Sequence, residues 1–204
     1  MSEHIAATVG GRPVLVSEVD LRETRLRATA LAAALPRAGT SEGRQLRRWL
    51  TQLLVTERVV AAEAAVRGLT ADGAPAEDEL LPDVAARLEI GSVAASALED
   101  PMGRALYARV TADVQISDAE VEDYHARNPF RFATPTMTTG GWHHPATAPA
   151  LADVRPAITQ NLLAAARRRS FRVWLDARRA ALVELAPGYE HPGDPRQPDN
   201  THKH

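Results

Sequence analysis

The sequence has no cysteine, a single lysine and few aromatic residues. Without thiols the chain cannot form disulfides, thiolate metal sites, iron–sulfur clusters or a cysteine nucleophile. Aromatic residues make up 4% of its 204 residues. A folded core must therefore be built mostly from Ala, Leu and Val, which favours helices over sheets. No apolar run approaches the roughly 18 residues of a transmembrane helix, so we expect no membrane partner.

The charges are almost balanced, with 24 Lys and Arg residues, 26 Asp and Glu residues and a formal net charge of −2. This balance argues against non-specific nucleic-acid binding as the main task, so nucleic acid is not an expected partner. Every one of the 24 basic residues except Lys203 is an arginine, a bias typical of a GC-rich genome. The first residues show neither the basic nor the apolar region of a signal peptide, which predicts a cytoplasmic location.

The start of the chain predicts a small β-hairpin followed by a helix. Two short runs rich in β-branched residues, 5–9 and 14–16, flank a turn over residues 10–13. Ser17 then predicts the N-cap of a helix that runs to about Ala34.

The next helix is predicted to be long, from Ser41 to a left-handed glycine cap at Gly68. Its apolar residues keep the spacing of one buried stripe. They are Leu46, Trp49, Leu50, Leu53, Leu54, Val60, Ala61 and Ala64.

Three further elements are indicated downstream. Asp100 predicts the N-cap of a helix, and Ser117 with Glu120 forms the capping box of another. A last long helix is predicted over about 155–180, and a final strand over 181–185, pairing with the N-terminal hairpin. The predicted fold is mostly α with a minor β element.

Three segments resemble the chaperone part of SurA/PrsA-type foldases. In that family a V-x-G-x-x-[IV] hairpin, a long helix ending in E-A-x-x-x-G and a [VI]-[ST]-x-x-E-[VI]-x-x-Y helix recur in this order. The matching stretches here are residues 6–20, 53–69 and 116–135. The closing helix, residues 158–182, also resembles the last helix of the family.

The resemblance implies a SurA-like helical domain whose last helix packs back on the N-terminal half. It would form one discontinuous unit within residues 1–185, made of 5–135 and 153–185, with 136–152 as a linker. Residues 186–204 would be an irregular tail rich in Pro, Asp and His.

The family's parvulin isomerase domain has no room in this chain. Only 17 residues lie between Pro135 and Asp153, whereas a domain needs about 50 or more. The sequence also lacks the G-x-S-x-G, P-loop, H-E-x-x-H and dinucleotide-binding motifs. We therefore expect a non-catalytic chaperone-like protein that binds an unfolded or specific partner protein through apolar surfaces between helices. Residual peptidyl-prolyl isomerase activity is a weaker alternative.

Three aromatic residues near the linker are candidates for polypeptide binding. Phe130, Phe132 and Trp142 would line an exposed apolar surface of the kind chaperones use. The alternative is that these rings hold the linker against the rest of the protein.

Five histidines form a second candidate set. His143 and His144 lie in the linker, and His191, His202 and His204 lie in the tail. Neutral imidazoles are ligands for Ni, Cu and Zn. This pattern leaves open a maturation factor that delivers a metal to one partner enzyme, and a polar linker and tail whose histidines bind nothing.

The last helix carries a dense group of arginines. They are Arg167, Arg168, Arg169, Arg172, Arg178 and Arg179. Interleaved Phe171 and Trp174 allow a nucleic-acid interpretation, with Arg on phosphates and rings on bases. We favour the alternative that both rings pack inward while the arginines face water or the acidic residues 77–79.

Overall fold

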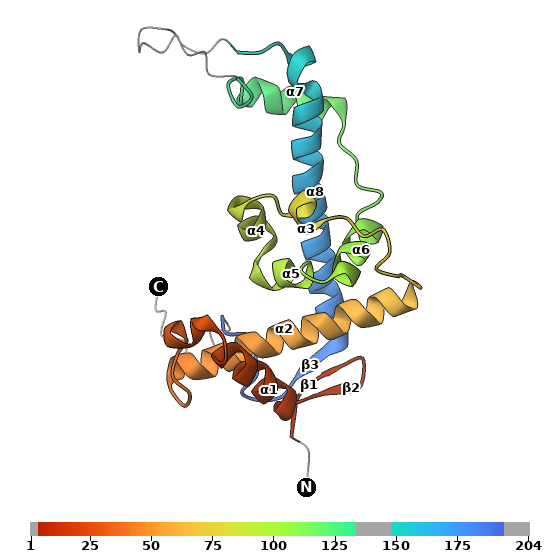
Figure 1. The fold of residues 1–204 in the computed structure, drawn as a ribbon. Coiled ribbons are helices and arrows are strands. Elements are labelled where there is room, and N and C mark those ends of the chain that lie inside the picture. The colour runs from red at the N-terminus through yellow and green to blue at the C-terminus, as the bar shows by residue number, and fades with distance from the viewer. Residues whose placement is uncertain (1–3, 134–147, 194–204) are drawn as a thin grey trace.

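The computed structural model describes residues 4–133 and 148–193. Within them lie eight α-helices, one short 3-10 helix and one three-stranded sheet, which confirms the mostly α class. Helix α8, Leu151–Leu182, runs along the length of the molecule (Figure 1). Every helix in this part of the chain is too short or too polar to span a bilayer.

The sheet joins the two ends of the chain. Strands β1, Ile5–Val9, and β2, Arg12–Leu15, form the predicted hairpin, and β3, Val183–Leu185, pairs antiparallel with the free side of β1. The two residues of the hairpin turn, Gly10 and Gly11, both have positive φ, which such tight turns require. The predicted pairing of the final strand with the hairpin is confirmed.

Helix α1, Val16–Arg27, starts directly where β2 ends, so the prediction of Ser17 as N-cap is wrong. Leu15 is the N-cap, and its amide donates a 2.9 Å hydrogen bond to the Glu18 carboxylate. The helix also ends earlier than predicted, and a separate 3-10 helix, Ala30–Ala34, follows it.

Helix α2, Ser41–Val66, is the long helix that the sequence predicts. The Thr40 hydroxyl accepts a 3.1 Å hydrogen bond from the amide of Gly43, and Gly68 adopts φ +61° just past the end. Residues on several faces of α2 are buried, because α1, β1, α5, α6 and α8 all pack against it.

Four short helices follow: α3, Glu77–Leu80; α4, Val84–Ile90; α5, Ser92–Ala97; and α6, Pro101–Val110. The Asp100 side chain caps α6 as predicted. Helices α5 and α6 pack on α2, whereas α4 packs on α8.

Helix α7, Asp118–Arg127, has the predicted capping box, with the amide of Ser117 donating to Glu120 at 2.8 Å. Helix α8 begins at Leu151 rather than near residue 155, so the last two residues of the predicted linker are helical. Pro156 is accommodated inside the helix, close to its start.

In the part of the chain that the structure describes, buried apolar residues form three clusters. The main cluster is centred on Phe171, Leu106 and Leu98, and a second lies under α1 around Val19 and Leu50. The third lies between α7 and the first half of α8, with Val121, Val154 and Ile158 at its centre. We call this third unit, α7 with the first half of α8, the tip, and the remainder the body. Figure 1 shows the tip at the end of α8 farthest from the sheet.

Candidate functional site

A hollow of about 380 Å³ opens in the body where α1, α2 and the junction of α5 with α6 meet. We call it the interhelical hollow. Its apolar lining residues are Val60, Ala61, Ala97, Pro101 and Met102. Val60 and Ala97 are buried, so they form its floor, whereas Ala61 and Pro101 are exposed at its side.

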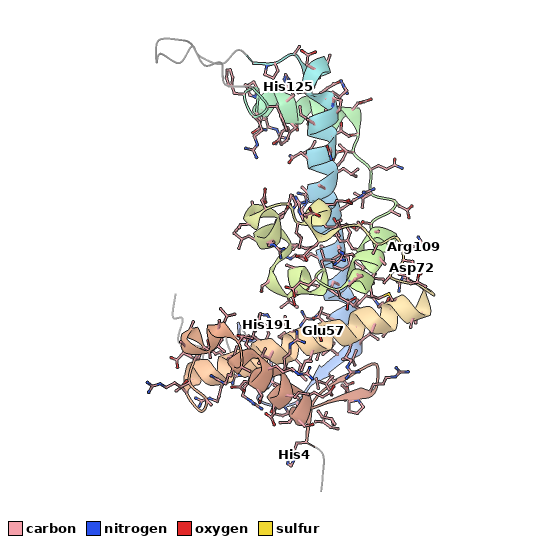
Figure 2. The ribbon with its side chains drawn as sticks, viewed as in Figure 1. His4, Glu57, Asp72, Arg109, His125 and His191 are labelled. Carbon is pink, nitrogen blue, oxygen red and sulfur yellow. The ribbon has the colours of Figure 1, made fainter. Side chains whose placement is uncertain are left out.

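Charged side chains surround this apolar floor. Arg22 of α1 donates a 2.9 Å hydrogen bond to Glu57 of α2, which is labelled in Figure 2. Glu99 and Asp100 line the hollow from the α5–α6 junction. Three carboxylates against one guanidinium make the lining net negative.

The lining of the interhelical hollow combines apolar and acidic side chains, which can bind an apolar group next to a cationic one. Ser96 supplies the one hydroxyl among the lining residues. An apolar side chain entering the hollow would lie against Val60 and Met102, while the carboxylates would receive a cationic group.

Of the three aromatic residues predicted to bind polypeptide, the two that the structure describes, Phe130 and Phe132, do not line this hollow. Phe130 and Phe132 follow α7 at the tip. The Phe130 side chain is 60% exposed. Phe132 packs into the tip cluster with its ring centroid 6.4 Å from that of Tyr124. Trp142 lies outside the described residues.

Of the predicted metal ligands, only His191 is described. It is exposed, and its Nδ1 accepts a 3.0 Å hydrogen bond from the amide of Gly193. His143, His144, His202 and His204 lie outside the described residues. Figure 2 shows His4, His125 and His191 in three separate regions.

No metal-binding cluster is seen in the part of the chain that the structure describes. A group of three or more His, Asp or Glu residues able to hold an ion is absent from residues 4–133 and 148–193. A Ni, Cu or Zn site therefore stays a prediction that depends on the remaining residues.

The arginine-rich part of α8 is mostly a packing surface. Phe171 is fully buried between Tyr107 and Trp174, with ring centroids 5.1 and 5.7 Å away. The expected inward packing of Phe171 is confirmed. Arg169 and Arg172 are exposed, as expected for arginines that face water, whereas Arg168 bonds Glu89 of α4 at 2.7 Å rather than residues 77–79.

The crossing of α2 and α8 contains a buried charge that sequence reasoning missed. Glu63 accepts hydrogen bonds from Arg178 Nε at 2.8 Å and from Arg67 on its own helix. Burial raises the pKa of Glu63, but the hydrogen bonds from Arg67 and Arg178 outweigh it, so this pKa lies below its ordinary value. The carboxylate is therefore charged where the helices cross.

Comparison with known proteins adds one short match. The profile of a family of unknown function, DUF7158, matches residues 5–42. This segment comprises the β1–β2 hairpin, α1 and the 3-10 helix, and it contributes Arg22 to the interhelical hollow. No curated protein and no solved structure matches the chain.

Proposed function

We propose that this chain is a non-catalytic, chaperone-like protein that binds extended polypeptide segments in the interhelical hollow. The observation that carries the proposal is an open hollow with an apolar floor and a net negative lining, built by four helices. The resemblance to the chaperone part of SurA/PrsA-type foldases supports the same class of function.

The size of the hollow favours an extended segment as the occupant. About 380 Å³ lies near the lower end of the roughly 300–1,000 Å³ of ligand pockets. That space holds a few side chains, not a folded partner. Burial of apolar surface against Val60 and Met102 would supply the affinity, at about 25 cal/mol per Å² before the ordering cost is subtracted.

Charge favours a segment that also carries a basic residue. Glu57 is already paired with Arg22. Among the described residues neither the Glu99 nor the Asp100 carboxylate forms an ion pair: Arg104 donates only to the backbone oxygen of Glu99, at 2.8 Å, and the Asp100 carboxylate accepts the Met102 amide at 2.7 Å. A lysine or arginine beside the client's apolar side chain would complement these two carboxylates. Binding would weaken as salt screens the charges.

The test is suppression of client aggregation by light scattering, without nucleotide. The wild-type protein is expected to suppress aggregation of a chemically unfolded client at about stoichiometric ratio. Met102→Arg places charge and bulk in the lining of the hollow and adds repulsion to a basic segment, so it is expected to abolish most of this suppression.

Val84→Arg is the matched control. Val84 is an exposed apolar residue in the first turn of α4, and Met102 is a half-buried apolar residue in the first turn of α6, so an arginine at either position meets a similar helix-dipole penalty. The control is expected to retain full suppression. Equal activity of the two variants, or no suppression by the wild-type protein, would refute the proposal. A third variant, Phe130→Asp, alters the exposed aromatic residue at the tip. If it were the only variant to lose suppression, the client-binding site would lie at the tip and the proposal would be wrong.

A further inference from the structure

A second hollow, of about 300 Å³, lies between α8 and the junction of α4 with α5. Arg172, Asp176 and Arg179 line it from α8, and His191 lines it from the segment after β3. We call it the Arg172–Arg179 hollow. It shares no lining residue with the interhelical hollow.

Arg172 has no carboxylate partner among the described residues. The nearby Glu89 carboxylate is taken by Arg168 at 2.7 Å and by Arg169 at 3.5 Å. Arg172 reaches only the backbone oxygen of Glu89, at 3.4 Å. Its charge is therefore not neutralised by an ion pair.

Arg179, the second arginine of the hollow, also has no ion-pair partner among the described residues. Its guanidinium donates to the neutral Gln52 Oε1, and within residues 4–133 and 148–193 it forms no ion pair. Burial lowers the pKa of Arg179, and the charge of Asp176 opposes that change only in part. A partly buried cation without a counter-ion gains free energy when an anion binds beside it.

We propose that the Arg172–Arg179 hollow binds an oxyanion, either a phosphate or a carboxylate. The two arginines are seven positions apart, about 10 Å along the helix axis, and line the same concavity. Guanidinium groups bind phosphate and carboxylate oxygens through paired hydrogen bonds. Only Asp176 contributes a negative charge to the lining, against the two arginines, so the net charge of the lining is positive.

Calorimetric titration of the full chain with inorganic phosphate, at constant ionic strength, tests the proposal. The wild-type protein is expected to give saturable binding. Arg172→Gln is expected to weaken it about tenfold, the usual effect of losing one charge-assisted contact. Arg172 is exposed, so this variant is expected to keep the wild-type circular dichroism spectrum.

Arg169→Gln is the matched control, because Arg169 lies on the same helix, is exposed and is paired with Glu89. It is expected to bind phosphate like the wild-type protein. A parallel titration uses a short peptide with a free C-terminal carboxylate and the same peptide amidated.

The phosphate titration and the peptide titration together distinguish the source of the oxyanion. Binding of the free-acid peptide but not the amide supports a chain-terminal carboxylate, and binding of phosphate alone supports a free phosphate-type ligand. Absence of saturable binding in both arms overturns the proposal. Equal weakening by Arg169→Gln also overturns it, since that result means general screening of a basic helix. Neither outcome bears on the interhelical hollow.

Discussion

Glu63 shows how one residue holds two distant parts of this chain together. Its side chain is 5% exposed and accepts hydrogen bonds from Arg178, which lies on α8, 115 positions away. A buried carboxylate is costly unless it is paired, and here two guanidiniums supply the pairing. The apolar spacing of α2 predicts that this helix is buried, but spacing on one helix says nothing about which arginine crosses over it.

Acid is expected to weaken the folded state through Glu63. Its pKa in the folded protein lies below the ordinary value of 4.5. The stabilisation is therefore complete above pH 4.5 and is lost as the pH falls through the lower, folded-state pKa. Urea unfolding at a series of pH values is expected to show this decline.

The Glu63→Gln variant removes the carboxylate charge and so measures how much the charged Glu63 contributes to the stability of the folded state. At neutral pH the variant is expected to be less stable by about 2 kcal/mol, because two guanidiniums lose their shared charge partner. Its stability should also fall less steeply in acid than that of the wild-type protein. Asp123→Asn, which breaks the exposed pair with Arg127, is the control and is expected to change stability by about 0.5 kcal/mol or less. Parallel acid profiles for wild type and Glu63→Gln would contradict this account.

For individual helices, the first residue can be predicted from the neighbouring sequence where a side-chain N-cap sets it. Asp100 and Ser117 were predicted correctly because an N-cap bond involves only neighbouring residues. Ser17 was not, because β2 continues into α1 without a loop and Glu18 takes the capping role. The end of β2 in the hairpin, rather than a side-chain cap at Ser17, therefore marks where α1 begins.

The tip is expected to unfold separately from the body. Ile158 is fully buried in the tip cluster, which shares no buried residue with the main cluster. Ile158→Ala is expected to cost about 2–5 kcal/mol locally. By hydrogen exchange, amides of α7 should then exchange faster while those of α2 are unchanged.

Val173→Ala provides the comparison on the same helix, since that side chain is 69% exposed. It should leave the exchange of α7 and α2 as in the wild-type protein. If Ile158→Ala instead accelerated exchange in α2 as much as in α7, tip and body would be one cooperative unit.

At the scale of the whole molecule, the return of the C-terminal segment was predictable, but the site was not. The family-like order of segments predicted that the last helix would meet α2, and α8 does pack on α2 while β3 pairs with β1. The interhelical hollow draws Arg22, Glu57 and Met102 from three separate stretches of sequence. Residues that come together only through tertiary packing form no motif in the sequence, so this hollow could not be predicted. A single aromatic residue such as Phe130 can be picked out as a candidate from the sequence itself.

Site-specific photo-crosslinking shows whether polypeptide binds in the interhelical hollow, as we propose. A photoreactive benzophenone residue is placed at Ala61, an exposed residue beside the hollow, or at Val66, which is 82% exposed on the same helix but outside it. Each protein is irradiated with the same unfolded client. We expect abundant adducts from position 61 and few from position 66. Equal yields at both positions, or adducts at position 66 alone, would contradict the claim.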